Sequence, residues 1–423
     1  MLKKWHVPLT ACVKDEGEEE LSDTVPPSML PPSDEGMPTF GSELTAEHQE
    51  DLRRIIKEFN DVLTAAPGRT PLVSHKIETD GVQPVRQRLY RIPYALKDTV
   101  KEEIDRMLAM GVIQESTSEC ASPAVLDTKK DGSVRFCVDF RELKRSRSDA
   151  YPMPRVEEVL DRIGRAKFIS TMDLSRAYWQ VPVDEDSRSK TAFVTEFGLY
   201  EFVTMPFGLH GAPVTFQRLM DQVLRGANEN SDAFIDDVTV FSSTWVEHGK
   251  HLRDTFYRLR EAGLTVKPKK TRLGMRETPL LGDIVGEGTR RPDPSKLEAV
   301  KDFKQPETKK DVRAFLGLTG YYRTFILGCA SRAAALTDLT RKREPSNLTW
   351  TPACTAAFQD LKDALCSQPV LSNPDLKWPF VLQVDASDVG LGAVLSQVGD
   401  DGEEHPIAYA SWKLFLRVEV CND

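Results

Sequence analysis

The segment that most constrains this chain lies where two apolar runs are separated by a pair of acids. Residues 233–235 and 238–241 are rich in β-branched and aromatic residues, which favour strands, and Asp236-Asp237 stands between them. Because so short a polar interruption reverses the chain tightly, the pattern predicts a hairpin with carboxylates at its turn. Another strand, residues 168–172, runs directly into Asp173. The sequence therefore predicts three aspartates at strand ends.

These three aspartates indicate a metal site, since neighbouring carboxylates repel each other unless a cation lies beside them. Mg²⁺ prefers a few carboxylate oxygens together with water and substrate phosphate, and two such ions can align an attacking and a leaving oxygen. Asp173, Asp236 and Asp237 would suffice for that chemistry. Taken alone, however, Asp236-Asp237 is more often a solvent-exposed turn, because Asp is a favoured turn residue. The metal hypothesis therefore needs further motifs.

Length and composition limit the class of protein. With 423 residues, the chain is too long for one ordinary core, so two or three globular units and some linker are expected. No run approaches the ~20 apolar residues of a membrane span, and the N-terminus lacks the apolar core of a signal peptide. The seven cysteines contain no C-x-x-C pair, which favours a reducing compartment and argues against a zinc site. We expect a protein of the cytoplasm or the nucleus without a membrane partner.

The net charge of −9 is concentrated near the N-terminus. Residues 1–50 hold three Lys against eleven Asp or Glu, a balance of −8, which leaves −1 for the rest of the chain. Residues 1–43 combine Glu and Pro with few aromatics, so we expect a disordered acidic leader or linker there. Basic runs at 141–147 and 267–276 are typical both of solvated surface and of phosphate binding. Charge alone does not distinguish these alternatives.

Helical and strand patterns follow one another along the remaining chain. Apolar residues at spacings of three and four predict helices at 52–59, 96–108, 308–316 and 358–365. Apolar runs predict strands at 123–126, 134–138 and 380–384. The turn-forming Lys129-Lys130-Asp131-Gly132 makes the first two of these strands a hairpin with a basic tip. The last strand runs into Asp385.

Further motifs surround the aspartates in a definite order. They are Thr171-Met172-Asp173-Leu174, Ala177-Tyr178-Trp179-Gln180, Thr191-Ala192-Phe193, Met205-Pro206-Phe207-Gly208-Leu209 and Phe234-Ile235-Asp236-Asp237. Flanking motifs occur at residues 129–136, 149–154, 264–270 and 312–323. In order and spacing, this set resembles the reverse transcriptase of gypsy-class LTR retrotransposon Pol polyproteins, over all but the leader. The resemblance implies an α+β chain with the right-hand polymerase fold of fingers, palm and thumb.

The resemblance also implies an activity and its cofactor. The activity is RNA-directed DNA polymerisation by two-metal nucleotidyl transfer onto a primer 3′-hydroxyl. Asp173 and Asp236 would ligate two Mg²⁺ ions, with Mn²⁺ as an alternative, helped by the backbone carbonyl of Leu174. Asp237 would supply negative field and a weaker contact. The partners would be an RNA or DNA template, a primer strand and deoxynucleoside triphosphates, whereas the oligomeric state is left open.

Other residues match the family's nucleotide-binding positions. Arg135, with Lys129 or Lys130, would neutralise the incoming triphosphate, and the sequence does not separate the two lysines. Tyr178 would pack beneath the nucleotide sugar and exclude a 2′-hydroxyl, the alternative being an ordinary core aromatic. Phe207 would line the nucleotide pocket, the alternative being only a tight turn. The resemblance further implies contacts to the primer-template backbone from Lys267, Lys269 and Lys270.

The last unit resembles the start of the ribonuclease H domain that follows the polymerase in these elements. Motifs at residues 350–352, 384–387 and 405–411 carry this likeness, and Asp385 matches the first metal-binding acid. One carboxylate does not hold two metals, and the further acids would come from later elements. We therefore expect a ribonuclease H-like α/β domain that is incomplete and inactive in this chain.

The motifs divide the chain and leave three hypotheses. The expected parts are a leader at 1–43, fingers and palm at 44–250, a thumb at 251–344 and the ribonuclease H-like part at 345–423. An active polymerase is favoured because its acids and nucleotide-binding residues are all present. The polar stretch 144–148, where the family is apolar, supports instead a catalytically decayed, nucleic-acid-binding remnant. An unrelated metal-dependent phosphoesterase would explain neither the basic hairpin nor the ordered motifs.

Overall fold

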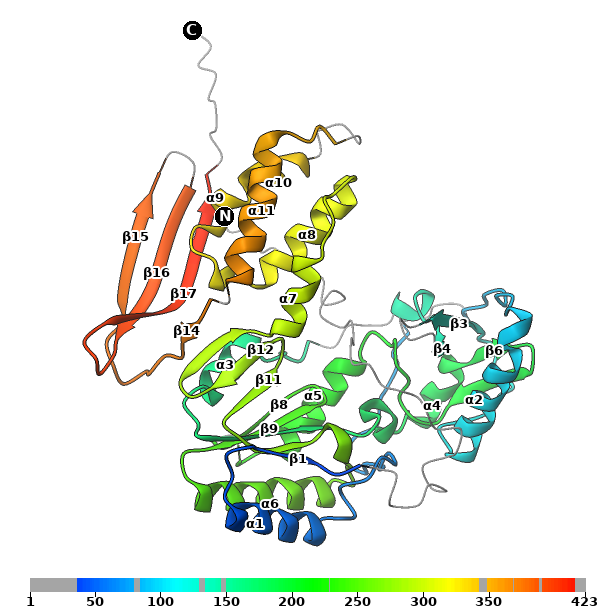
Figure 1. Ribbon diagram of the computed structural model, residues 1–423. Coiled ribbons are helices and arrows are strands. Elements are labelled where there is room, and N and C mark those ends of the chain that lie inside the picture. Colours follow the sequence, from blue (N-terminus) through cyan, green and yellow to red (C-terminus); the bar gives the residue numbers. More distant parts are fainter. Residues whose placement is uncertain are drawn as a thin grey trace. The chain divides into compact units, whose positions relative to one another are not determined.

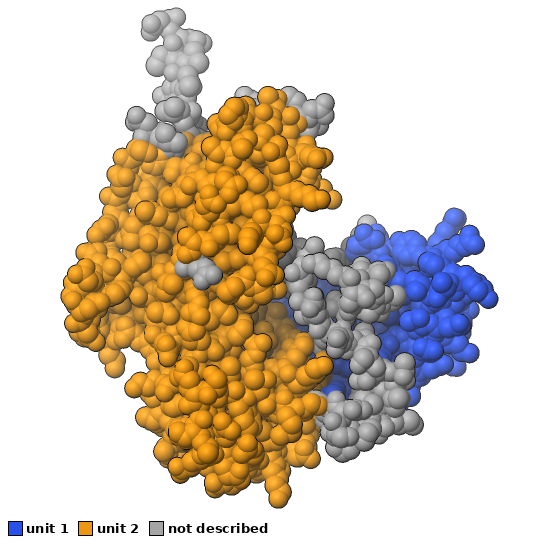
Figure 2. Space-filling model, viewed as in Figure 1, with its two compact units in different colours: residues 1–35, 65–150, 176–215 blue, residues 36–64, 151–175, 216–423 orange. Residues whose placement is uncertain are grey.

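Figure 1 shows a computed structural model of the protein, which describes residues 36–79, 84–128, 134–145, 150–227, 229–341, 348–367, 369–387 and 390–414. The described residues belong to two compact units (Figure 2). The first is drawn from residues 65–150 and 176–215, the second from 36–64, 151–175 and 216–423. No described helix is long and apolar enough to cross a membrane.

The first unit is built around a five-stranded sheet, here called the finger sheet. Its strand order is β2-β7-β6-β3-β4. The strands are β2 (Ile113–Glu115), β3 (Ser122–Thr128), β4 (Val134–Val138), β6 (Phe193–Thr195) and β7 (Gly198–Phe202). The helices of this unit are α2 (Lys97–Ala109) and α4 (Glu185–Arg188), with 3₁₀ turns η4 (Tyr94–Leu96), η5 (Glu142–Arg145), η6 (Ala177–Gln180) and η7 (Ser189–Thr191).

The core of the first unit gathers around Phe193, which is fully buried. Its ring lies 5.2 Å from that of Phe202 and 5.7 Å from that of Phe136. Both distances fall in the range where aromatic pairs attract beyond their burial. The predicted hairpin is confirmed, because β3 and β4 pair antiparallel from Ala124 and Val138 onward. Its basic tip, including Lys129 and Lys130, lies outside the described residues.

The second unit contains the sheet that carries the aspartates, here called the palm sheet. Its five strands run in the order β1-β10-β5-β9-β8. They are β1 (Thr39–Phe40), β5 (Phe168–Asp173), β8 (Ser231–Phe234), β9 (Asp237–Ser242) and β10 (Arg272–Met275). β1 pairs parallel with β10. Ordered structure therefore begins before Leu44, inside the segment expected to be leader, because residues 39 and 40 complete the edge of this sheet.

Helices cover both faces of the palm sheet. α1 (Ala46–Glu58) and α6 (Trp245–Glu261) lie side by side on one face, where the rings of Phe59 and Phe256 are 5.4 Å apart (Figure 1). α3 (Val156–Ile163) packs on Ile169 from the other face. Since successive strand residues point to opposite faces, β5 is buried on both. The aspartate-bearing strand is therefore packed against helices on both faces.

The remaining chain of the second unit forms two more sheets and a helical layer. A four-stranded sheet, here called the connecting sheet, contains β11 (Glu277–Leu280), β12 (Asp283–Gly286), β13 (Thr289–Pro292) and β14 (Leu371–Ser372). The helical elements are α7 (Pro294–Lys301), α8 (Lys309–Tyr321), α9 (Cys329–Arg332), α10 (Ala334–Leu339), α11 (Pro352–Cys366), η8 (Pro268–Lys270) and η9 (Arg323–Phe325). The helix predicted from residue 308 is confirmed as α8, and a capping box begins it, since Thr308 and Asp311 exchange side chain to backbone hydrogen bonds.

Three antiparallel strands form a final sheet, here called the terminal sheet. They are β15 (Val381–Ala386), β16 (Gly390–Val398) and β17 (Glu404–Lys413). One face meets the helical layer, where Ile407 is 4% exposed and the Ser411 hydroxyl accepts from the amide of Ala330. The other face carries Leu382, Val384, Leu391 and Trp412, with exposures of 63%, 67%, 43% and 71%. This sheet is therefore covered on one side and apolar on the open side.

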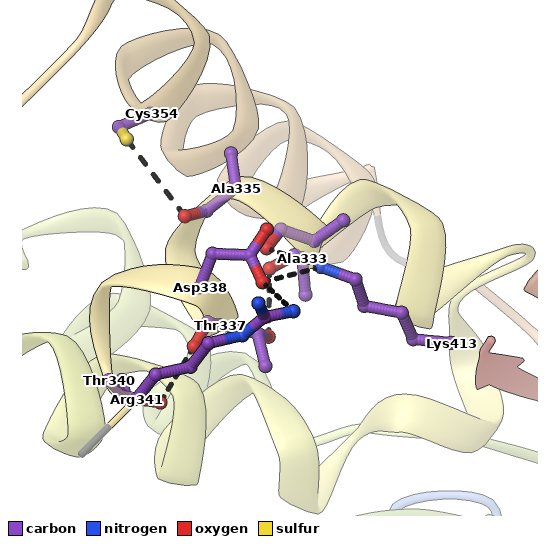
Figure 3. Close-up of polar contacts among 9 residues, drawn as sticks. Ala333, Ala335, Thr337, Asp338, Thr340, Arg341, Cys354 and Lys413 are labelled. Atoms are coloured by element: carbon purple, nitrogen blue, oxygen red, sulfur yellow. Dashed lines mark hydrogen bonds and ion pairs between the residues drawn. The ribbon is translucent and has the colours of Figure 1, made fainter. Parts of the chain in front are cut away.

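Lys413 ties the end of β17 to α10. Its ammonium lies 2.8 Å from the Asp338 carboxylate and donates to the carbonyl of Ala334 at 3.2 Å (Figure 3). Arg341 reaches the same carboxylate at 2.7 Å. Asp338 therefore forms ion pairs with two cations, Lys413 from the terminal sheet and Arg341 from the helical layer.

Candidate active site

Strand pairing brings two of the predicted aspartates directly opposite each other. Asp173 is the last residue of β5 and Asp237 the first of β9, and the two are register partners across the antiparallel pair. Asp236 precedes Asp237 in the turn that leads from β8. The turn comprises Ile235 and Asp236, because Phe234 pairs with Asp237. It therefore lies one residue earlier than the sequence pattern predicted, and all three carboxylates share one end of the sheet.

The turn is backbone-strained and hydrogen-bonded. Ile235 has φ 58°, a left-handed conformation that is rare for a β-branched residue and costs on the order of 1–3 kcal/mol. Its amide donates to the side-chain oxygen of Gln217 at 2.7 Å. The carbonyl of Asp236 accepts from the amide of Leu174 at 3.2 Å. Asp236 and the residue after Asp173 are thus joined through the main chain.

The segment around η8 supports Asp173 from the other side. The amide of Lys267 donates to the Asp173 carbonyl at 2.8 Å, and Leu174 forms a bridge with Val266. The Lys270 ammonium lies 3.2 Å from the Asp173 carboxylate, with side-chain exposures of 29% and 25%. Lys269 is exposed. Of the lysines predicted to bind nucleic acid, Lys270 therefore also lies against a predicted catalytic acid.

The carboxylates at this end of the palm sheet fit a magnesium-type ion, which needs few protein ligands. Within the described ranges, no three His, Cys, Asp or Glu side chains are grouped closely enough to hold a metal. Mg²⁺ commonly takes one or two carboxylates and completes its shell with water and substrate phosphates. Asp173 is partly exposed and already has a cation, Lys270, within ion-pair distance. Asp173 and Asp236 are the residues that would hold such an ion.

Two predicted nucleotide-binding residues lie together in the first unit. Tyr178 is in η6 and 8% exposed, whereas Phe207 is 50% exposed. Their ring centroids are 5.0 Å apart. Burial of Tyr178 agrees both with an ordinary core aromatic and with a ring that packs beneath the nucleotide sugar, so its role stays a prediction. Gly208, with φ 91°, confirms a turn directly after Phe207.

The other predicted site residues are separate from these. Arg135 lies in β4 with its backbone opposite Asp127, and its side chain is not among those described. Asp385 lies inside β15 rather than after it, exposed and opposite Gly392. No second acid is opposite Asp385 in the described strands of the terminal sheet. Asp385 therefore differs from Asp173, which has an acid as its register partner.

Gln217 was missed by the sequence reasoning. It is 1% exposed on α5 (Ala212–Val223), within a stripe that otherwise contains Phe216, Leu219 and Met220. The available signal was a long polar residue on the apolar face of a helix, which needs a buried partner. Such a residue indicates a fixed polar contact.

Comparison with known proteins gives the same assignment for two parts of the chain. Residues 128–319 match the family model described as reverse transcriptase (RNA-dependent DNA polymerase). Residues 350–416 match the RNase H-like domain found in reverse transcriptase.

Several polyproteins are similar to most of the chain. The retrovirus-related Pol polyproteins from transposons 297 and gypsy of Drosophila melanogaster are 37% and 35% identical over 349 and 373 residues. These matches cover 81% and 84% of this chain but 32% and 36% of the relatives. The Tf2-3 transposon polyprotein of Schizosaccharomyces pombe is 31% identical over 86% of this chain and 28% of its own length. The chain thus spans about a third of the length of these relatives.

Solved structures agree with the fold. The foamy viral protease-reverse transcriptase in complex with dsDNA has a TM-score of 0.80 and 26% identity, covering 88% of this chain and 79% of that one. The same kind of protein in complex with an RNA/DNA hybrid has a TM-score of 0.78 and 26% identity, covering 88% and 51%. The predicted reverse-transcriptase fold with an RNase H-like part is therefore confirmed. Residues 128–319 therefore belong to the reverse-transcriptase family and are followed by an RNase H-like domain, and most of the chain is similar to retrotransposon Pol polyproteins such as that of gypsy.

Proposed function

We propose that this chain is an RNA-directed DNA polymerase that extends a primer 3′-hydroxyl with deoxynucleotides. One observation carries the proposal: Asp173 and Asp237 are register partners, and Asp236 lies in the adjoining turn. Paired carboxylates at one end of a doubly covered sheet suit metal-assisted nucleotidyl transfer. Reverse transcriptases use divalent metal ions, and we propose two Mg²⁺ ions here, with Mn²⁺ as a substitute.

In this proposal, Asp173 and Asp236 bind the ions, together with the backbone carbonyl of Leu174. Bound Mg²⁺ would neutralise the charge of the triphosphate and align the reacting oxygens. Asp237 adds negative field from the first position of β9. Lys270, 3.2 Å from the Asp173 carboxylate, balances charge at the same end of the sheet. The chain's own contribution is thus fixed charge on a rigid frame.

Substrates and partners are proposed on the same basis. Tyr178 and Phe207 would contact the nucleotide, and Arg135 with Lys129 or Lys130 would bind its phosphates. Lys267, Lys269 and Lys270 would bind the backbone of the primer-template, giving salt-sensitive affinity. Similar foamy viral proteins are described in complex with dsDNA and with an RNA/DNA hybrid. We propose both kinds of duplex as partners.

The RNase H-like part adds a second candidate site at Asp385. Its carboxylate is exposed on β15, opposite Gly392. We propose that Asp385 is a metal-binding acid of this part and that hybrid cleavage needs further acids. If the unmutated chain cleaves a labelled RNA/DNA hybrid and Asp385→Asn does not, the proposal that cleavage needs further acids is contradicted.

Primer extension tests the polymerase. On a polyribonucleotide template with Mg²⁺, the unmutated chain should synthesise DNA, and Asp236→Asn should lower the rate at least ~10³-fold, equivalent to ~4 kcal/mol. Asp254→Asn, an exposed acid on α6, is the matched control. No synthesis by the unmutated chain, with salt-sensitive duplex binding intact, would favour the decayed remnant instead.

A further inference from the structure

The strained turn before Asp236 depends on a side chain outside the aspartate motif. Ile235 is 9% exposed and has φ 58°, so neither solvent nor an ordinary backbone preference stabilises its conformation. Its amide donates to the Gln217 side-chain oxygen at 2.7 Å. A buried amide of this kind needs its partner, because an unmade hydrogen bond is costly away from water.

Gln217 uses its whole amide group on this hairpin and its support. The side-chain nitrogen donates to the Ala233 carbonyl at 2.9 Å and to the Asp221 carboxylate at 2.9 Å. The side-chain oxygen accepts from Ile235. An inverted amide would face an N–H with its own N–H and two acceptors with its oxygen. The three contacts therefore define one orientation of Gln217, which spans the turn from Ala233 to Ile235.

Asp221 and Tyr151 hold Gln217 in that orientation. Asp221 lies one helical turn after Gln217 on α5, and its second oxygen accepts from the Tyr151 hydroxyl at 2.6 Å. This hydrogen bond, followed by burial, raises the pKa of Tyr151. The Arg218 guanidinium lies 5.0 Å from the centroid of the Tyr151 ring. The chain of contacts thus runs from Tyr151 through Asp221 and Gln217 to the turn.

The turn connects these hydrogen bonds to the proposed metal-binding acids through the main chain. Asp236 follows Ile235 directly, and its carbonyl accepts from the amide of Leu174, the residue after Asp173. A change in the Ile235 peptide therefore displaces Asp236 relative to Asp173. Groups that orient metal-binding residues commonly change metal affinity or activity by ~10–100-fold when they are removed.

We propose that Gln217, oriented by Asp221 and Tyr151, is a positioning residue that sets the spacing of Asp236 and Asp173 for metal binding. This inference rests on the proposed polymerase function. It assigns Gln217 no contact with substrate. Its effect is carried by the main chain of the turn.

Direct metal binding provides a test that does not depend on activity. The full chain is titrated with Mn²⁺, and free Mn²⁺ is followed by electron paramagnetic resonance. Gln217→Met keeps the length of the side chain but removes all three hydrogen bonds, so the Mn²⁺ Kd should rise about 10-fold. Gln222→Met, the same substitution at an exposed position of α5, should bind Mn²⁺ as the unmutated chain does.

Two further variants separate positioning from folding. Asp221→Asn keeps an acceptor for Gln217 and should retain near-normal Mn²⁺ affinity, which makes it the conservative rescue. Tyr151→Phe removes only a hydroxyl and should raise the Kd in the same direction by a smaller factor. If Gln217→Met fails to fold, the comparison of Tyr151→Phe with Asp221→Asn still tests the inference.

Primer extension then distinguishes the two proposals. The Mg²⁺ concentration for half-maximal synthesis should rise about 10-fold in Gln217→Met, with the KM for primer-template unchanged. A Mn²⁺ Kd and a Mg²⁺ dependence that match Gln222→Met in both Gln217→Met and Tyr151→Phe would overturn the role of Gln217. If Gln217→Met loses Mn²⁺ affinity but even the unmutated chain synthesises no DNA, the proposed polymerase function is overturned. The positioning role of Gln217 then remains intact.

Discussion

The palm sheet and the terminal sheet each carry a predicted metal-binding acid, but they surround it differently. Asp173 has Asp237 as its register partner and Asp236 in the adjoining turn. Asp385 has Gly392 as its register partner, and Gly392 pairs in turn with Ser411. A carboxylate on a strand becomes part of a multi-acid site when the neighbouring strand supplies another at the same level. Strand register, more than the acid itself, therefore distinguishes the two sites.

The two sheets also differ in how they are covered. Ile169, Met172 and Leu273 of the palm sheet are at most 1% exposed. On the open face of the terminal sheet, Val384 is 67% exposed and Trp412 is 71% exposed. A site held by buried strands keeps its geometry, because its supporting side chains are fixed by packing. The palm sheet meets that condition on both faces and the terminal sheet on one.

The largest contrast is expected between Asp173→Asn and Asp385→Asn in DNA synthesis. Asp173→Asn removes a charge that we propose binds metal, and it should reduce primer extension at least ~10³-fold. Asp385 lies in another sheet, so Asp385→Asn should leave the rate of synthesis unchanged. Steady-state primer extension with both variants, at equal duplex occupancy, measures the contrast. Equal losses would show that the two acids serve one site.

The next contrast concerns stability and uses one substitution in both sheets. Leu273→Ala, at a fully buried position of β10, should lower the free energy of unfolding by about 2–5 kcal/mol. Leu382→Ala, at a position of β15 with 63% exposure, should change it by less than about 0.5 kcal/mol. Urea titrations give both values. A cost at Leu382 as large as that at Leu273 would mean that the open face is covered in solution.

A pH dependence follows from the face of the palm sheet beneath α6. There, His248 bonds Ser170 at 2.8 Å through Nε2 and Ser242 at 3.1 Å through Nδ1. Burial, and to a lesser extent His251, lowers the pKa of His248 from 6.5 to about 3. Between these values the unfolded chain binds a proton that the folded chain does not. Stability should therefore fall as the pH falls through this window, by up to about 1.4 kcal/mol per pH unit.

His248→Asn should remove this slope, although the variant will be less stable at pH 7.5. Unfolding free energies at pH 7.5 and 5.5 should differ by about 1.4 kcal/mol less in the variant than in the unmutated chain. The control is His405→Asn in the terminal sheet. The His405 side chain is 42% exposed and pairs with Asp401. An unchanged slope in His248→Asn would show that another group controls the acid response.

The sequence predicted the local elements well and their assembly less completely. Apolar spacing placed α1, α2 and the β3–β4 hairpin, because each depends on residues close together in the chain. The sequence grouped Asp173 with Asp236 and Asp237 but did not predict that Asp173 and Asp237 are register partners, since register between distant strands is set by the tertiary fold. The two-residue strands β1 and β14 carry too short a pattern to be recognised.

The site shows the same division. Asp173, Asp236 and Asp237 could be found because a run of apolar strand residues ends at each motif. For Gln217 the sequence offers only a polar residue in an apolar helical stripe, which does not reveal the distant backbone group that this side chain contacts. The contact of Lys270 with Asp173 was also unforeseen, since the sequence indicated only a basic run. Residues that act through a distant hydrogen bond therefore need the structure.

The smallest effect is expected at the junction of the terminal sheet with the helical layer. Lys413 pairs with Asp338 at 2.8 Å, with side-chain exposures of 16% and 45% (Figure 3). Asp338 retains Arg341 when Lys413 is replaced, so no buried charge is left alone. Lys413→Met should therefore lower the free energy of unfolding by at most about 1 kcal/mol, and less in about 1 M NaCl, where the pair is screened. Lys377→Met, at an exposed lysine before the terminal sheet, provides the control. A loss several times larger, and independent of salt, would mean that this one contact holds the terminal sheet to the helices and that their apolar packing does not.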